Sequence, residues 1–145
     1  TPEGRILLMK LEEPVSRRQI WITPGGAIEQ GENAESCLRR EVAEETGLQS
    51  IQVGPLMWTR SHDFEWNGQR IRQHEAFYLV EAPPFDPTIE NNPALGERSA
   101  LRGFQWWSVD DIRSSSELFA PRRLAELLDM LLRTGPPDEP LDVER

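Results

Sequence analysis

The stretch Gly26–Leu48, GAIEQGENAESCLRREVAEETGL, is the most informative part of this chain and holds six glutamates. Asn33 has a side chain that commonly caps the first turn of a helix, and Gly47 is the residue type that most often follows the last turn. We therefore expect a helix that begins after Asn33 and runs to about Thr46. Three glutamates fall in its second half, where like charges at neighbouring positions repel one another. Such a helix needs a partner that offsets the repulsion.

The expected helix directs these acids toward the protein body. Successive helical residues are about 100° apart, and Leu38 and Val42 mark the apolar stripe. Glu45 projects close to Leu38, inside that stripe, while Glu41 lies at its edge. Glu44 is further round. Partly buried carboxylates are unfavourable unless they are paired or bind a metal, and an all-oxygen ligand set suits Mg²⁺ or Mn²⁺. The alternative is a solvated acidic face that pairs with neighbouring arginines.

The spacing of these residues resembles the Nudix box of the Nudix hydrolases at every defining position. Gly26 is followed by five residues and Glu32, and then by seven residues and the run REVAEETGL at Arg40–Leu48. A chance match in a chain of this size is on the order of one in ten million. Weaker resemblance includes the run WITPGG at Trp21–Gly26 and the region around Trp106-Trp107, so it spans most of the chain.

The resemblance implies a fold and an activity. Nudix hydrolases are α/β proteins, in which a loop–helix–loop packs on a mixed β-sheet within an α/β/α sandwich. They use Mg²⁺ or Mn²⁺ to hydrolyse the pyrophosphate bond of a nucleoside diphosphate linked to another moiety. The substrate would be a nucleotide sugar such as ADP-ribose, a nucleoside triphosphate, a dinucleoside polyphosphate or a coenzyme A-type molecule. The box does not choose among these classes.

Two other functions share the same fold. One is a non-catalytic nucleotide-ligand sensor or regulatory module, but such modules often have a degraded box, and every acid of the box is present here. The other is isopentenyl diphosphate isomerase, whose additional histidine and cysteine metal ligands are not evident in this chain.

The resemblance also assigns roles to residues of the box. The metal ligands would be the Gly26 backbone carbonyl and the carboxylates of Glu41, Glu44 and Glu45, which are also the catalytic candidates. Glu32 and Arg40 would form a structural ion pair that fixes the loop against the helix.

A further acid outside the box is a catalytic candidate, because family members differ in which carboxylate accepts the proton of the attacking water. Glu97 lies in a long Pro-rich segment, where some members place that acid, and Glu90 is a weaker rival. The alternative for Glu97 is an ordinary exposed glutamate, although long loops often carry functional residues.

Apolar runs, turn residues and caps predict the remaining elements. We expect strands at Ile6–Leu11, Ile20–Ile22, Leu56–Trp66, Arg70–Val80 and Gly103–Trp107, a helical start at Ser108–Asp111, and an amphipathic helix at Pro121–Arg133. That helix has Leu124, Leu127, Leu128, Leu131 and Leu132 on its apolar face. Asn67-Gly68 is a strong hairpin turn. The turn-like Pro2-Glu3-Gly4 predicts an upstream strand that the sequence lacks.

The Asn67-Gly68 hairpin places charged residues opposite one another. Its register predicts cross-strand ion pairs between Arg60 and Glu75 and between Asp63 and Arg72. Arg70, Arg72 and His74 alternate onto one strand face and could bind phosphate, although nearby acids could equally neutralise the arginines. Most of the five tryptophans are expected in the core, with one available to stack on a substrate base.

Length and charge bound the remaining possibilities. A chain of 145 residues suits one domain, which we place at residues 1–135, followed by a mobile acidic Pro-rich tail at residues 136–145. The net charge of −9 disfavours a nucleic acid polymer as partner. No transmembrane run or secretory leader is apparent, and the single Cys37 fits a reducing compartment, so we expect a cytoplasmic protein without a membrane partner. Family members often form homodimers, and the sequence leaves this open.

Overall fold

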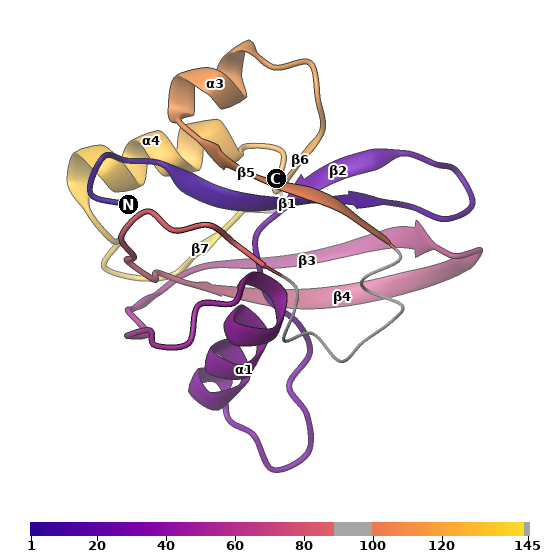
Figure 1. The fold of residues 1–145 in the computed structure, drawn as a ribbon, viewed down its shortest axis with the longest axis horizontal. Coiled ribbons are helices and arrows are strands. Elements are labelled where there is room, and N and C mark those ends of the chain that lie inside the picture. The colour runs from indigo at the N-terminus through magenta and orange to yellow at the C-terminus, as the bar shows by residue number, and fades with distance from the viewer. Residues whose placement is uncertain (89–99, 144–145) are drawn as a thin grey trace.

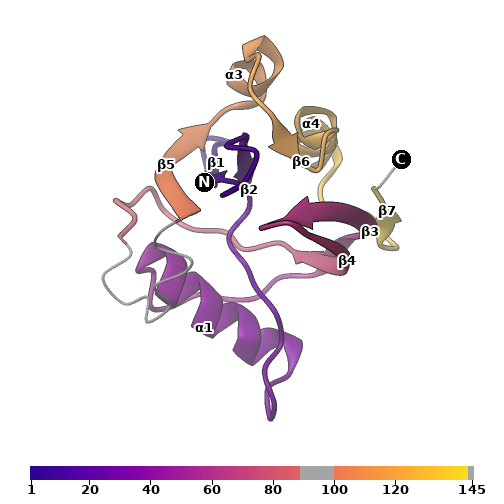
Figure 2. The ribbon, with the colours of Figure 1, turned by 90° about the vertical axis from the view of Figure 1, so that its right-hand side faces the viewer.

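Two β-sheets lie between helices in the computed structural model, which describes residues 1–88 and 100–143. Figures 1 and 2 show α1 (Ala34–Thr46) on one side of the sheets, and α3 (Val109–Ser114) and α4 (Leu124–Thr134) on the opposite side. The strands are β1 (Ile6–Glu12), β2 (Gln19–Ile22), β3 (Leu56–Trp66), β4 (Gln69–Tyr78), β5 (Leu101–Trp107), β6 (Phe119–Ala120) and β7 (Leu141–Asp142). The expected α/β architecture is confirmed.

The first sheet has the strand order β5-β1-β2-β6 and is mixed, because β6 runs parallel to β2 while the other pairs are antiparallel. The inner strand β1 carries Leu7, Leu8 and Met9, all of them buried. A strand that is covered on both faces has a continuous apolar sequence. This is why the apolar run predicts a strand here although apolar and polar residues do not alternate.

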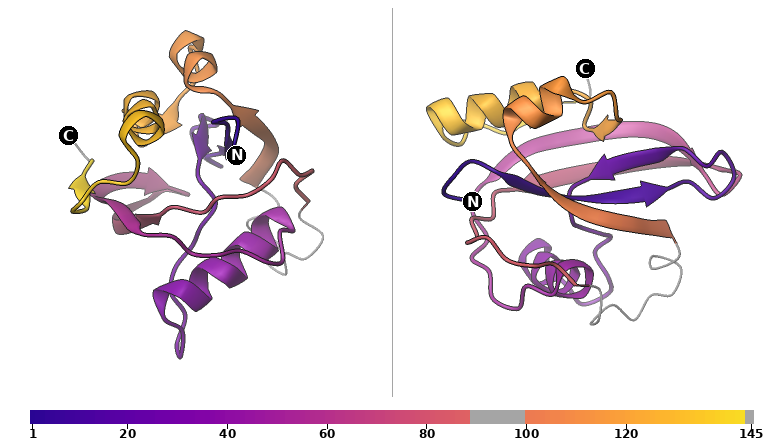
Figure 3. Two further views of the ribbon diagram at one scale, coloured as in Figure 1. Left: turned by 90° about the vertical axis from the view of Figure 1, so that its left-hand side faces the viewer. Right: turned by 45° about the horizontal axis from the view of Figure 1, so that its top comes forward.

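The second sheet has the order β4-β3-β7 and is also mixed. Asn67 and Gly68 both have positive φ values, 52° and 77°, as the tight hairpin turn requires. The predicted register is confirmed, since Arg60 lies opposite Glu75 and Asp63 opposite Arg72. Figure 3 shows the tip of the β1–β2 hairpin and the tip of the β3–β4 hairpin on the same side of the molecule. There the backbone N–H of Asn67 donates to Glu13 at 2.6 Å.

The core between the sheets and α4 takes up three of the five tryptophans. Trp21 packs edge-on against Trp107 with ring centroids 5.2 Å apart, and Trp58 is buried beside them. Leu8 and Leu124 are fully buried in the same cluster. These three indoles are therefore packing residues, as expected for most of them, and are not free to stack on a base.

Helix α1 begins and ends where its sequence predicts. The Asn33 side chain accepts a hydrogen bond from the Ser36 backbone N–H, and the Ser36 hydroxyl accepts one from the Asn33 backbone N–H. Gly47 adopts the left-handed conformation with φ 83° and donates its N–H to the Ala43 carbonyl. Both caps are local interactions, so the neighbouring residues are sufficient to fix the bounds of the helix.

Several expected boundaries were wrong. Strand β4 ends at Tyr78 rather than Val80, and β5 begins at Leu101 rather than Gly103. Helix α4 begins at Leu124 instead of Pro121, and Leu132 is 51% exposed rather than part of its apolar face. These ends depend on which neighbours the elements pack against, and a sequence pattern does not contain those neighbours.

The expectation of a mobile C-terminal tail was wrong for its last described residues. Leu141 and Asp142 form β7, which pairs in parallel with β3, and Val143 is 3% exposed within the core. The backbone N–H of Val143 also donates to Thr59 at 2.9 Å. Separately, no helix within residues 1–88 and 100–143 is long and apolar enough to cross a membrane.

Candidate active site

The loop between β2 and α1 folds back onto the second half of the helix. The backbone N–H of Gly25 donates to Glu45 Oε2 at 3.2 Å, which ties the Pro-Gly-Gly turn to the far end of α1. Glu45 is 6% exposed, so its carboxylate lies between the loop and the protein body. The sequence therefore brings residues 20 positions apart into one site.

Gly26 lies directly against the Glu41 carboxylate. A Cβ atom at Gly26 would lie 2.4 Å from the Glu41 carboxyl carbon and Oε1 and 2.7 Å from Oε2, so the carboxylate would have to shift. The absence of a side chain at Gly26 thus allows the backbone to approach the acid. On the other side, the Cys37 thiol donates to the Gly26 carbonyl oxygen at 3.7 Å.

Arg40 binds Glu32 through two parallel hydrogen bonds. Arg40 Nε lies 2.7 Å from Glu32 Oε2, and Arg40 Nη2 lies 3.0 Å from Glu32 Oε1. Hydrogen bonding to Arg40 lowers the pKa of Glu32, and hydrogen bonding to Glu32 raises the pKa of Arg40. Both groups therefore remain charged near neutral pH, and the pair joins the loop to α1.

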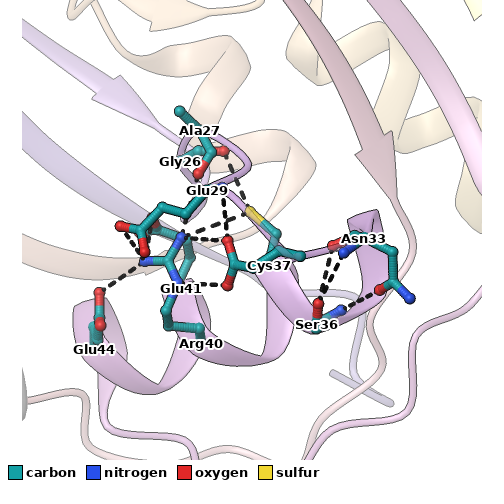
Figure 4. A network of polar contacts seen from close by, with 10 residues as sticks. Gly26, Ala27, Glu29, Asn33, Ser36, Cys37, Arg40, Glu41 and Glu44 are labelled. Atoms are coloured by element: carbon teal, nitrogen blue, oxygen red, sulfur yellow. Dashed lines mark hydrogen bonds and ion pairs between the residues drawn. The ribbon is translucent and has the colours of Figure 1, made fainter.

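The remaining nitrogen of the same guanidinium faces the catalytic candidates. Arg40 Nη1 lies 2.8 Å from Glu41 Oε1 and 3.2 Å from Glu44 Oε2. Figure 4 shows Arg40 between these acids and the backbone at Gly26 and Ala27. The Ala27 carbonyl oxygen accepts a hydrogen bond from Arg40 Nη2 at 3.2 Å. One arginine therefore connects the loop with two acids of the helix.

Glu41 combines burial with an incomplete set of hydrogen bonds. The residue is 5% exposed, and its Oε2 has no hydrogen-bond partner among residues 1–88 and 100–143. A buried carboxylate oxygen without a donor is unfavourable by about 1–3 kcal/mol. Such an oxygen is suited to accept a cation or a proton, and this property sets Glu41 apart from an ordinary buried ion pair.

The donor set fits a hard divalent cation, although the side chains do not form a ready-made cluster. Glu41, Glu44, Glu45 and the Gly26 carbonyl offer only oxygen, the ligand type that Mg²⁺ and Mn²⁺ prefer. Within the described residues, no three Glu, Asp, His or Cys side chains come close enough together to hold a metal ion. Arg40 Nη1 lies where two of these carboxylates meet, so they contact a guanidinium nitrogen in this structure.

Cys37 contacts the site, but its surroundings do not activate its thiol as a nucleophile. Its side chain is buried, and this burial raises the pKa of the thiol above its ordinary value. A thiol with a raised pKa is protonated at neutral pH and is a poor nucleophile. This environment is that of a packing residue.

The second charged region lies on the β3–β4 hairpin. Glu75 Oε1 lies 2.7 Å from His62 Nε2 and 3.4 Å from Arg60 Nη2, and Arg60 is only 8% exposed. On the other face, Asp63 accepts two hydrogen bonds from Arg72, at 2.8 and 3.2 Å, and lies 3.7 Å from Arg70. The arginines on that face are therefore paired with an acid.

The structure brings the box residues together and leaves the outlying candidates untested. Glu97 and Glu90 lie outside the described residues. Sequence reasoning missed the hydrogen bond from Gly25 to Glu45. It considered pairing of the helix acids with neighbouring arginines only as the alternative to a metal site, and Arg40 does contact Glu41 and Glu44. The i,i+4 spacing of Arg40 and Glu44 was an available signal for the second of these contacts.

Three comparisons with known proteins agree with this geometry. Residues 1–129 match the NUDIX domain family. The nucleoside triphosphatase NudI of Escherichia coli O139:H28 (strain E24377A / ETEC) is 35% identical over 111 residues, which cover 77% of each chain. The MutT NUDIX hydrolase from Burkholderia pseudomallei is 26% identical, with a TM-score of 0.61 over 88% of each chain.

The fold is shared more widely than the sequence. The MutT protein from Methanosarcina mazei Go1 has a TM-score of 0.65 at 21% identity, covering 91% of this chain and 88% of that one. Nudix hydrolases generally use a divalent metal and act on nucleotides. With the box, the fold and these relatives in agreement, the chain belongs to the Nudix family and is a pyrophosphohydrolase.

Proposed function

We propose that this enzyme hydrolyses a pyrophosphate bond of a nucleoside triphosphate, with Mg²⁺ or Mn²⁺ held by Glu41, Glu44, Glu45 and the Gly26 carbonyl. The observation that carries the proposal is the buried Glu41 Oε2, which has no partner among the described residues and lies against the Gly26 backbone. The substrate class is supported by the 35% identity to a protein named nucleoside triphosphatase.

Contacts between the β2–α1 loop and α1 fix the positions of the proposed metal ligands. Glu45 accepts the Gly25 N–H, which holds the glycine turn against α1, and the Glu32–Arg40 pair holds the rest of the loop. The absence of a side chain at Gly26 lets its backbone reach Glu41. A cation held by Glu41, Glu44, Glu45 and the Gly26 carbonyl would supply a water of lowered pKa and would neutralise charge on phosphoryl oxygens.

A carboxylate must accept the proton of the attacking water. Among the box acids, Glu41 is the one with a buried oxygen that lacks a donor in the described residues. Glu97, which lies outside them, is the candidate from beyond the box. Comparing the pH dependence of kcat for Glu41→Gln and Glu97→Gln separates the two, because loss of the base removes the acidic limb of the profile.

The proposed function is tested by incubating the purified protein with nucleoside triphosphates, deoxynucleoside triphosphates, ADP-ribose and a dinucleoside polyphosphate, each with Mg²⁺, Mn²⁺ or chelator. Mass spectrometry of the products identifies the phosphorus that was attacked. We expect metal-dependent cleavage of a triphosphate with the highest kcat/KM in the panel. Preferred cleavage of ADP-ribose would move the substrate to the nucleotide sugars. Saturable binding without turnover would contradict the proposal and favour a sensor.

A further inference from the structure

Arg40 is surrounded by more negative charge than one guanidinium can balance. It contacts Glu32, Glu41 and Glu44 at hydrogen-bond distance, and Nη1 lies 3.7 Å from Glu29. The side chains of Glu32 and Glu41 are 15% and 7% exposed, so solvent screens their charges only partly. The cluster therefore carries an excess of negative charge.

The contacts of Arg40 divide into two groups with different geometry. The Nε and Nη2 atoms bind Glu32 at 2.7 and 3.0 Å, in the two-pronged arrangement that gives arginine–carboxylate pairs their strength. Nη1 points away from Glu32 and bridges single oxygens of Glu41 and Glu44 at 2.8 and 3.2 Å. The first group anchors the side chain, and the second can be lost without releasing the anchor.

We propose that Nη1 of Arg40 is a displaceable counter-ion for Glu41 and Glu44, and that it competes with the divalent cation for these carboxylates. This inference rests on the proposed function, which assigns both acids to the metal. Without metal, Nη1 offsets the repulsion between the two acids. With metal, Glu41 and Glu44 exchange the guanidinium for the cation, while Arg40 stays bound to Glu32.

Removal of Arg40 should change the metal affinity in opposite directions, depending on whether the arginine competes with the cation or only holds the loop in place. If Arg40 only holds the loop in place, its removal disorders the site and weakens metal binding. If Nη1 competes with the cation, its removal leaves Glu41 and Glu44 unneutralised, which destabilises the metal-free protein and strengthens its attraction for a cation. The sign of the change in metal affinity therefore distinguishes the two roles.

The experiment measures Mn²⁺ binding by calorimetry, and thermal unfolding in EDTA and in saturating Mn²⁺, for the wild type, Arg40→Gln and Glu32→Gln. For Arg40→Gln we expect the Kd for Mn²⁺ to tighten by about tenfold to a hundredfold, the range of one hydrogen bond to a charged group. We also expect its Tm deficit to be larger in EDTA than in Mn²⁺. Glu32→Gln is the matched control, because it removes the anchor but keeps the arginine charge, and its Tm should fall equally in both conditions.

A weakened or unchanged Kd in Arg40→Gln, with equal Tm losses in EDTA and Mn²⁺, would overturn the inference. A second measurement uses only the wild type and so does not depend on a variant that folds. In ¹⁵N NMR spectra titrated with Mg²⁺, the Arg40 Nη1 resonance should shift while the Nε–H bound to Glu32 remains protected from exchange. Unchanged Nη1 resonances at saturating Mg²⁺ would also overturn it.

The two proposals fail in different ways. Absence of saturable Mn²⁺ binding in the wild type rejects the metal site of the proposed function and the inference with it. Saturable binding in the wild type, combined with the structural outcome for Arg40→Gln, rejects the inference alone and leaves the proposed function standing.

Discussion

Two regions of this protein keep charged side chains partly out of water, and they balance those charges in opposite ways. On α1 and its loop, one guanidinium is shared among Glu32, Glu41 and Glu44. On the β3–β4 hairpin, one carboxylate, Glu75, is shared between Arg60 and His62. The first region has too many acids for its cation, and the second has two basic groups around a single acid.

The two regions differ in which charge is in excess, because the acids outnumber the guanidinium in the first region and the basic groups outnumber the acid in the second. A carboxylate surrounded by donors, such as Glu75, has its charge satisfied by the fold. Glu41 keeps a buried oxygen without a donor in the described residues. Residue types alone do not reveal this distinction, because both regions combine glutamate with arginine. Substitution of the proposed metal-site acids in the first region should therefore act mainly on activity, and substitution of Glu75 in the second region should act mainly on stability.

The largest expected effect is that of Glu45→Gln on turnover. Loss of a carboxylate from the proposed metal site should lower kcat by about 10²–10³-fold. The amide oxygen of glutamine can still accept the Gly25 N–H, so the unfolding free energy should change by less than about 1 kcal/mol. Steady-state kinetics and denaturant unfolding measure both quantities. Glu35→Gln, on the exposed face of the same helix, is the control with the same change of charge and should retain wild-type kcat. Full activity of Glu45→Gln would reject the site.

Gly26→Ala should reduce both activity and stability. The new Cβ would meet the Glu41 carboxylate at 2.4 Å, so one of the two must move. Displacement of the acid by about 1 Å should lower kcat by about 10²-fold, and overpacking should lower the unfolding free energy by about 1–3 kcal/mol. The double variant Gly26→Ala/Glu41→Asp, which shortens the clashing side chain, should recover stability without recovering kcat. Unchanged stability of the single variant would mean that the Glu41 carboxylate moves away from the new Cβ without cost, which contradicts the expected overpacking.

Glu75→Gln should have the opposite balance of effects. Without the carboxylate, the buried Arg60 loses a charged partner, and the unfolding free energy should fall by about 1–3 kcal/mol. Because the hairpin is not assigned to the chemical step, kcat should stay within about threefold of the wild type. Denaturant unfolding and initial rates on the same samples measure the two changes. A large loss of kcat without loss of stability would remove the distinction between the two regions.

The smallest expected effect is a change in the pH dependence of stability in Glu32→Gln. Hydrogen bonding to Arg40 lowers the pKa of Glu32 in the folded state, so the unfolded chain binds a proton at higher pH than the folded one. The stabilisation is complete above the unfolded pKa, which is near the ordinary value of 4.5, and is lost as the pH falls below that value and through the folded pKa. The unfolding free energy of the variant should therefore fall less steeply over this window. An identical slope would show that the Glu32–Arg40 pair is not maintained in solution.

The elements predicted correctly are those whose signals are local. The caps of α1 at Asn33 and Gly47 and the hairpin turn at Asn67-Gly68 depend on residues within one turn of the chain. The β6 and β7 strands were missed, because each has two residues and exists only through parallel pairing with a distant strand. The burial of Val143 depends on the same long-range pairing.

The sequence predicts those features of the candidate site that depend only on the spacing of residues along α1. The wheel of α1 places Glu41 and Glu45 toward the protein body, and both residues are buried. The contacts of Arg40 could not be read in the same way, because a long flexible side chain can reach several acids and its rotamer is set by the folded loop. Glu97 stays a prediction.

The sequence by itself determined the family, the residue types of the site and the bounds of its helix, because the box and its caps are local patterns with fixed spacing. Only the tertiary structure decided how the charges are shared. The loop must fold back before Gly25 can reach Glu45, before Gly26 can press against Glu41, and before Arg40 can bind Glu32. Burial and hydrogen bonding are properties of that folded arrangement. They leave Glu41 with one buried oxygen that has no hydrogen-bond partner among the described residues, whereas Glu32 accepts two hydrogen bonds from Arg40.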